Sequence, residues 1–190
     1  MTKPRTSPRP AKEPKAPPDA EQAFEIAGRF LGTRPRSRWE VEQRLRRSGA
    51  ADDVVAATLE RLERIGFVDD LAFARWWVEQ RDRHAPRGRF ALETELRAKR
   101  IPPPIIAALR QASDGDQPTT EDERAAAALD RHLKGRQVPE DPKAVQRLGM
   151  FLVRRGFEPA TARRAILAAI AESTRVESTA GGGRSESEEG

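Results

Sequence analysis

The chain has 190 residues, carries 35 Lys and Arg against 30 Asp and Glu for a formal charge of +5, and contains neither Cys nor Tyr. Disulfides and thiol chemistry are therefore excluded, and His84 and His132 lie too far apart in the sequence to indicate a zinc site or a histidine-based triad. No stretch approaches the roughly 20 apolar residues that span a bilayer, and the N-terminus lacks the apolar segment of a signal peptide, so we expect a cytoplasmic protein without a membrane segment.

The two ends of the chain differ in composition from the part between them. Residues 1–18 are rich in proline, lysine and arginine and have no periodic apolar positions, which predicts a disordered basic arm. Residues 173–190 contain acids and a run of three glycines, which predicts a disordered acidic tail. The glycines are not followed by Lys-Ser or Lys-Thr, so they do not indicate a phosphate-binding loop.

The first predicted unit, residues 19–66, contains three helical patterns with apolar residues three or four positions apart. Side chains that can accept a hydrogen bond from the first turn precede each pattern, and the first two have Gln or Glu three residues later, as in a capping box. The expected caps are Asp19, Ser37 and Asp52. Glycines suited to a left-handed helix end follow the second and third helices, at Gly49 and Gly66.

The stretch GFVDDLAFA places two carboxylates side by side between two helical patterns. Gly66 is expected to end one helix so that Phe67 packs back on Leu62, and Asp69 is expected to cap the next helix. Asp70 then faces the positive end of the helix dipole, while Val68 and Phe73 form a hydrophobic staple. The structural motif comprises Gly66, Phe67, Asp69, Asp70, Phe73 and Ala74. The alternative, a catalytic or metal-binding pair such as that of a magnesium-dependent nuclease, lacks a third ligand nearby in the sequence.

The helical pattern of the first unit recurs along the chain. SRWEVEQRLRRSGA, from Ser37, matches GRFALETELRAKRI, from Gly88, at an offset of 51 residues, and a weaker copy passes through Leu148 and Leu152. Asp141-Pro142 predicts the cap and the first residue of the helix in that third copy. We therefore predict an all-α fold, an elongated array of three tandem three-helix repeats, with the second repeat at 67–112, a linker at 113–119 and the third repeat at 120–172.

These motifs resemble those of the RecX family, bacterial modulators of the recombinase RecA. The resemblance rests on RSRWEVEQRLRRSG, GFVDDLAFARWWVEQR and GRFALETELRAKRI in that order, and it covers the third unit by pattern alone. It implies a regulator without enzymatic activity or cofactor, whose repeats lie along the groove of the RecA filament on single-stranded DNA. Such a protein inhibits ATP hydrolysis and strand exchange by RecA and so modulates recombination, DNA repair and the SOS response; we expect it to be a monomer.

Two residues depart from the family pattern. Phe67 stands where the family commonly has Tyr, which keeps the packing and loses a hydroxyl group. Arg100 stands where the family commonly has Gly at a helix end. Either Arg100 adopts a strained left-handed conformation or this helix ends differently.

Basic residues cluster in each unit and are the candidates for binding a partner. Their recurrence suggests a stripe that contacts acidic patches of RecA or the phosphates of single- or double-stranded DNA. The alternative is a solvated helical face, because Glu40, Glu42, Glu93 and Glu95 lie on the same helices and can pair with them. The candidates are Arg34, Arg36, Arg38, Arg44, Arg46, Arg47, Arg81, Arg83, Arg87, Arg89, Arg97, Lys99, Arg100, Arg154, Arg155, Arg163 and Arg164.

A second function is compatible with the same features. Short capped helices that are joined by tight turns and rich in arginine also occur in helix-turn-helix regulators, which insert a helix into the major groove of duplex DNA. Against this reading, the three basic units lack an evident dimerisation segment. An extended contact with a polymer therefore fits the sequence better than recognition of a palindromic operator.

Overall fold

The computed structural model describes residues 16–112 and 119–181. Within these residues the secondary structure consists of nine helices and no strands, so the predicted all-α class is confirmed. The helices are α1 (Ala20–Leu31), α2 (Arg38–Arg47), α3 (Asp52–Arg64), α4 (Asp70–His84), α5 (Arg89–Ala98), α6 (Pro103–Ala112), α7 (Glu121–Leu133), α8 (Pro142–Arg154) and α9 (Pro159–Gly181).

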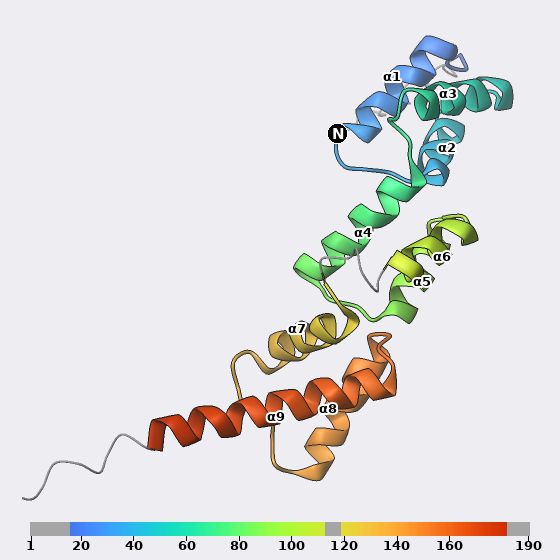
Figure 1. Ribbon diagram of the computed structural model, residues 1–190. Helices are drawn as coiled ribbons and strands as arrows, with labels where there is room; N and C mark the ends of the chain where they lie inside the picture. Colours follow the sequence, from blue (N-terminus) through green and yellow to red (C-terminus); the bar gives the residue numbers. More distant parts are fainter. Residues whose placement is uncertain (1–15, 113–118, 182–190) are drawn as a thin grey trace, which may run out of the picture.

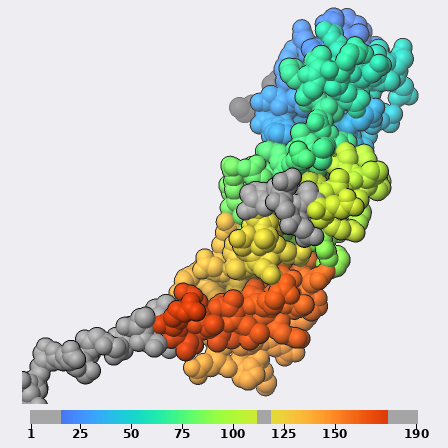
Figure 2. All heavy atoms as spheres, viewed as in Figure 1, coloured from blue at the N-terminus to red at the C-terminus, as the bar shows by residue number. Residues whose placement is uncertain are grey.

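The helices form three units that follow one another along an elongated molecule (Figure 1). Unit one (α1–α3), unit two (α4–α6) and unit three (α7–α9) each have a separate hydrophobic core, and the space-filling view shows the units in a row (Figure 2). Because each unit buries its own apolar face, the residues that the structure describes form three cores and not one. The predicted elongated array of three three-helix repeats is confirmed. Fully buried side chains at the three centres are Leu45 and Leu62, Phe73 and Leu96, and Leu129 and Leu152.

Most of the predicted helix starts are confirmed. Asp19 and Ser37 form complete capping boxes, and Asp141 caps α8 with Pro142 as its first residue. The prediction for α3 was wrong: Ala51 occupies the cap position without a side-chain hydrogen bond, and Asp52 is already the first helical residue. There its carboxylate can interact with the helix dipole but makes no cap hydrogen bond.

The second helix of a unit ends in the same way in α2 and α5. The N–H of Ala50 bonds to the carbonyl of Leu45, and the N–H of Ile101 bonds to that of Leu96. These are Schellman bonds, which require a left-handed residue just before the donor. Gly49 supplies it in α2 with φ +85° and Arg100 in α5 with φ +59°, as Gly156 does after α8 with φ +89°.

Arg100 therefore adopts the left-handed conformation, which favours glycine. A residue with a Cβ atom pays about 1 to 2 kcal/mol for this backbone, and the Arg100 side chain makes no hydrogen bond or ion pair with the described residues that would offset it. We expect Arg100→Gly to raise the free energy of unfolding by about 1 kcal/mol in a urea titration. Arg100→Asn should give a smaller gain, and a loss of stability in the glycine variant would contradict this account.

The last helix extends beyond the expected boundary. α9 continues to Gly181, although the acidic tail was predicted to begin at residue 173. Ser173 Oγ donates to the carbonyl of Ala169 at 2.9 Å, and Thr174 Oγ1 donates to that of Ile170 at 3.1 Å, so both hydroxyl groups find acceptors inside the helix. The other parts of the predicted arm, linker and tail, residues 1–15, 113–118 and 182–190, lie outside the described residues.

The first junction, meaning the contacts between units one and two, contains a polar network. Ser37 Oγ, at the start of α2, donates to the carbonyl of Lys99 at the end of α5 (3.0 Å). Glu40 Oε1 lies 2.7 Å from Lys99 Nζ and 3.0 Å from Arg34 Nη2. Burial raises the pKa of Glu40, but hydrogen bonds from Arg34, Lys99 and the N–H of Ser37 outweigh burial and leave its pKa below the usual value.

The second junction, between units two and three, brings two glycines into close contact. The N–H of Gly88 donates to the carbonyl of Arg155 (3.0 Å), and the N–H of Phe90 donates to that of Gly156 (3.3 Å). A Cβ atom on Gly88 would lie 2.2 Å from the carbonyl carbon of Gly156. The start of α5 therefore packs backbone to backbone against the end of α8.

The two junctions use corresponding positions of the repeat. Gly88 matches Ser37 at the start of the second helix of a unit, and Arg155 matches Lys99 at its end. In both junctions a donor at the start of one helix bonds to a carbonyl at the end of the next unit's helix, and this satisfies groups that a helix leaves open at its ends. The arrangement is head to tail at both junctions, but the donor is a side-chain hydroxyl in the first and a backbone N–H in the second.

A buried ion pair also crosses the second junction. Arg124 Nε of α7 donates to Asp82 Oδ1 of α4 at 2.8 Å, and their side chains are only 6% and 13% exposed. Arg89 of α5 pairs with Glu158, and its N–H donates to Glu121 Oε1. Because buried charges are tolerated only with partners, the Arg124–Asp82 pair favours this placement of units two and three, and the more exposed contacts of Arg89 add to it.

Candidate partner-binding surface

The segment that leads into α4 forms the predicted helix end but not the predicted side-chain contact. Gly66 has φ +76°, and the N–H groups of Gly66 and Phe67 bond to the carbonyls of Glu63 and Leu62, which confirms the Schellman turn. The prediction that Phe67 packs on Leu62 was wrong, because Phe67 is 61% exposed while Val68 is buried in the core of unit one. Neighbouring residues of an extended segment point to opposite sides, so turning Val68 inward turns Phe67 outward.

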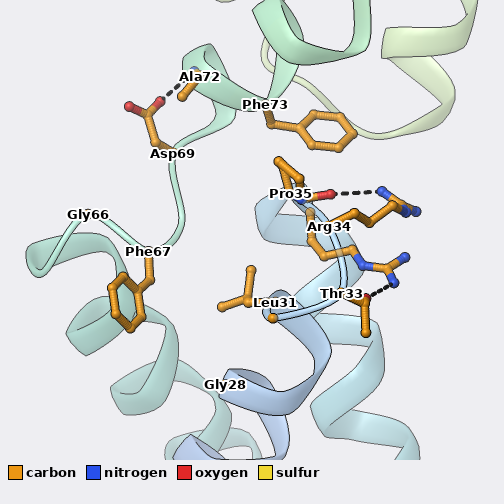
Figure 3. Close-up of a pocket in the computed structure, with 12 residues that line it drawn as sticks. Gly28, Leu31, Thr33, Arg34, Pro35, Gly66, Phe67, Asp69, Ala72 and Phe73 are labelled. Carbon is orange, nitrogen blue, oxygen red and sulfur yellow. Dashed lines mark hydrogen bonds between the residues drawn. The ribbon is translucent and has the colours of Figure 1, made fainter. Parts of the chain in front are cut away.

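The two adjacent carboxylates have separate structural roles. Asp69 Oδ1 accepts from the N–H groups of Leu71 (2.8 Å) and Ala72 (3.0 Å), so the predicted N-cap is confirmed (Figure 3). Asp70 Oδ1 accepts from the N–H of Arg38 at 2.8 Å and so connects the start of α4 to the start of α2. Burial raises the pKa of Asp70, while the hydrogen bond and the charge of Arg38 oppose that shift.

Val68 and the motif residues Phe73 and Ala74 serve the packing of the units. Val68 belongs to the core of unit one, whereas Phe73 and Ala74 belong to that of unit two, so the expected staple is replaced by contacts in two neighbouring cores. Within the described part of the chain, no group of three or more His, Asp or Glu residues is arranged to hold a metal ion. The hydrogen bonds that Asp69 and Asp70 accept stabilise the starts of α4 and α2.

A cavity of about 600 Å³ lies beside this motif, between the end of α1 and the segment before α4 (Figure 3). Leu31 and the exposed ring of Phe67 line it together with Arg34 and Arg36. The Arg36 guanidinium donates to Thr33 Oγ1 at 2.8 Å. The cavity thus combines an exposed aromatic side chain with cationic groups, a combination that is common at interfaces with other macromolecules.

Most of the candidate basic residues interact with groups of the protein itself. Some pair with an acid on the same helix, such as Arg46 with Glu42 and Arg97 with Glu93, as the solvated-face alternative predicts. Others pair between elements or donate to backbone carbonyls and side-chain hydroxyl groups. The candidates with such partners are Arg34, Arg36, Arg38, Arg46, Arg81, Arg83, Arg87, Arg89, Arg97, Lys99, Arg155 and Arg164.

Five candidates remain available for contact with a partner. Their side chains are exposed and make no hydrogen bond or ion pair with any residue in the ranges 16–112 and 119–181. Four of them lie at or near the end of the second helix of their unit, where a cation also interacts favourably with the helix dipole, and the fifth, Arg163, lies near the start of α9. These residues are Arg44, Arg47, Arg100, Arg154 and Arg163.

Sequence reasoning missed a group of basic residues at the second junction. His84, Arg131, His132 and Lys134 line one cavity there together with Arg155. The two histidines are 48 positions apart and the other residues lie on several helices, so no local pattern in the sequence indicates that they meet. Only the packing of α4 against α7 and α8 could have revealed this group.

None of the helices in the described ranges has the length and apolar character needed to cross a bilayer.

Comparison with protein families agrees with the observed units. Models of the RecX family match residues 23–62 as the first three-helix domain, residues 69–109 as the second and residues 120–166 as the third. The three matches together span more than half of the chain and coincide with the three hydrophobic cores.

Individual relatives carry the name of a regulatory protein and not that of an enzyme. The Regulatory protein RecX of Mycolicibacterium smegmatis is 35% identical over 169 residues, which cover 82% of this chain and 88% of the relative. That of Prosthecochloris aestuarii is 36% identical over 149 residues, which cover 78% and 93% of the two chains. The expectation of a regulatory protein without enzymatic activity agrees with these names.

Solved structures show the same fold. The crystal structure of RecX from Lactobacillus salivarius superposes with a TM-score of 0.66 at 18% sequence identity and covers 80% of this chain and 96% of its own. A second crystal structure of regulatory protein RecX gives a TM-score of 0.60 at 20% identity. With three matched domains and relatives that are similar over most of their length, this chain belongs to the RecX family of regulatory proteins.

Proposed function

We propose that this protein binds the RecA filament on single-stranded DNA along its groove and inhibits ATP hydrolysis and strand exchange by RecA. It acts as a cytoplasmic monomer and in this way modulates recombination and DNA repair. Membership of the RecX family supports the choice of partner. The elongated shape supports the mode of binding, because a row of units can contact successive subunits of a polymer at the same time (Figure 2).

The observation that carries the proposal is the repeated head-to-tail junction. A carbonyl at the end of α5 meets the start of α2, and a carbonyl at the end of α8 meets the start of α5 in the same sense. Such junctions hold the units at fixed positions along one axis. Rigid spacing lowers the entropic cost of binding at several points, so weak contacts of the three units add up to a useful affinity.

The five arginines without partners supply the contacts in this proposal. Arg44 and Arg47 lie in unit one, Arg100 in unit two, and Arg154 and Arg163 in unit three, so every unit contributes at least one cation. Acidic patches of RecA or phosphates of the DNA are suitable counterparts. The cavity beside Phe67 adds an exposed aromatic side chain to the surface of unit one.

An ATPase titration tests the proposal. We expect substoichiometric amounts of the protein to lower the rate of ATP hydrolysis by RecA on single-stranded DNA, and we expect added salt to weaken the effect. The variant Arg44→Gln/Arg47→Gln should need about five- to tenfold more protein for half inhibition.

The control is Arg29→Gln/Arg64→Gln, which removes the same charge from unit one at arginines that pair with acids of their own helices. It should inhibit nearly as well as the natural sequence. The absence of inhibition at equimolar protein would refute the proposal. Sequence-selective binding to duplex DNA without RecA would favour the helix-turn-helix alternative instead.

A further inference from the structure

The cavity at the second junction has an unusual charge distribution. It measures about 230 Å³ and lies where the end of α4 meets α7 and α8. Five of the side chains that line it are basic, and the described residues of its lining include no Asp or Glu. This differs from the first junction, where Glu40 lies between Arg34 and Lys99. The basic residues of this junction cavity are His84, Arg131, His132, Lys134 and Arg155.

The cations of the junction cavity are only partly satisfied by the protein. Arg131 Nη2 donates to the carbonyl of Arg83 at 2.7 Å, and Arg155 Nη1 donates to that of Pro86 at 3.4 Å. A guanidinium has five N–H donors, so each arginine keeps further donors for a ligand. The ammonium group of Lys134 makes no hydrogen bond or ion pair with the residues that the structure describes.

Like charges are also concentrated around this cavity. Burial lowers the pKa of Arg155, and the positive charges of Arg87 and Arg131 lower it further. Arg87 Nε is buried and has no hydrogen-bond partner among the described residues; Glu95 Oε1 lies 3.9 Å away. A bound anion would reduce the repulsion between these cations, because no carboxylate in the lining does so.

We propose that the junction cavity binds a phosphate group, held by Arg131, Lys134 and Arg155 with His84 and His132 beside it. The arginines offer planar N–H pairs and the lysine offers a compact charge, which together suit the several oxygens of a phosphate. A cavity of 230 Å³ is smaller than the roughly 300 Å³ at which pockets for whole small molecules begin, so it fits a phosphate group better than a complete nucleotide. The group is either free phosphate or one phosphodiester of a nucleic acid strand.

The proposal requires that Lys134 matter more than an ordinary surface lysine. Lys134 has φ +54°, a left-handed conformation that asparagine tolerates, so Lys134→Asn removes the charge without disturbing the end of α7. Lys143→Asn is the matched control, because Lys143 is exposed in the same unit and lies outside the cavity. Arg131→Gln serves as a second test at a different helix position.

The experiment uses the full chain and two probes at constant ionic strength. Inorganic phosphate is titrated while amide shifts are recorded by NMR, and a labelled single-stranded oligonucleotide is titrated by fluorescence anisotropy. We expect phosphate to shift the amides around Arg131 and Arg155. Lys134→Asn and Arg131→Gln should weaken phosphate binding about tenfold, the ratio expected for one charge-assisted hydrogen bond, whereas Lys143→Asn should change it less than twofold.

The two probes distinguish the source of the phosphate. If Lys134→Asn weakens oligonucleotide binding more than Lys143→Asn does, the ligand is a phosphodiester of a strand. If only phosphate binding changes, the site takes the free anion. The proposal is overturned if Lys134→Asn and Lys143→Asn behave alike with both probes, which includes the case in which phosphate shifts no amide of the cavity and the oligonucleotide binds both variants equally. Because neither probe contains RecA, the result does not depend on the proposed regulation of RecA.

Discussion

Gly88→Ala is expected to lower the free energy of unfolding by about 2 to 3 kcal/mol and to open the second junction. The added Cβ atom would lie 2.2 Å from the backbone of Gly156 and 2.3 Å from the nitrogen of Phe157, where no flexible side chain can move aside. Separation of the two backbone segments would also break the hydrogen bond from the N–H of Gly88 to the carbonyl of Arg155. Because units two and three keep their own cores, circular dichroism should still show mostly helix. Urea unfolding measures the loss of stability. Small-angle scattering should show that the positions of units two and three relative to each other vary more than in the natural sequence.

Two further variants separate the steric effect from other effects of alanine. Gly28→Ala places a methyl group inside α1 with no atom within 4 Å, and it should stabilise the protein by about 0.5 to 1 kcal/mol. Gly88→Ser introduces the residue that Ser37 provides at the corresponding position of unit one, so it improves the helix cap and keeps the clash. If Gly88→Ser is as stable as the natural sequence, the contact with Gly156 is not the constraint that we infer.

If the spacing of the units matters for binding to the RecA filament, the Gly88→Ala variant should also inhibit RecA less than the natural sequence does.

Glu40→Gln is expected to cost about 2 kcal/mol at neutral pH by removing the charge at the centre of the first junction. The carboxylate of Glu40 is 10% exposed and pairs with Arg34 and Lys99, whose side chains are 30% and 25% exposed. Glutamine can still accept the N–H of Ser37 in the capping box, so the variant removes the charge and leaves the helix start in place. Chemical unfolding at pH 7 measures the difference.

The cost of Glu40→Gln should depend on pH in a defined direction. The pKa of Glu40 is lower in the folded protein than in the unfolded chain, where it is about 4.3. The charged carboxylate therefore stabilises the fold above about pH 4.3, and this contribution is lost as the pH falls through the lower folded pKa. The difference between the two proteins should accordingly shrink in acid.

Glu60→Gln is the control: its exposed pair with Arg64 lies within α3, and its loss should cost no more than about 0.5 kcal/mol. Equal costs for both variants would contradict the assigned role of Glu40.

The local features of this fold follow closely from the sequence. The capping boxes at Asp19 and Ser37, the cap at Asp69 and the left-handed glycines at positions 49 and 66 all form as predicted. Each depends on residues within about one helical turn of one another, so the chemistry of a short segment is sufficient to specify it. The repeated spacing of these signals was also sufficient to predict three helical units.

The predictions that failed concern choices between neighbouring local options. Asp52 lies inside α3 and not at its cap, Phe67 points outward while Val68 takes the buried place, and α9 extends past residue 173. For Phe67 and Val68 the packing of the unit decides, because turning Val68 inward buries it in the core of unit one. The local signals at Asp52 and at residue 173 did not specify where α3 begins or where α9 ends.

By itself the sequence determined most of the helix starts to within a few residues, the three-unit order and the family to which the chain belongs. Only the tertiary structure decided which charged groups are joined to each other and which remain available: Glu40 takes Lys99 from another unit, and Arg44 and Arg47 keep no partner among the described residues. It also brought His84 and His132 to the same cavity and Gly88 against Gly156. The physical reason is range: caps and turns act over a few residues, whereas these contacts depend on how whole units pack against one another.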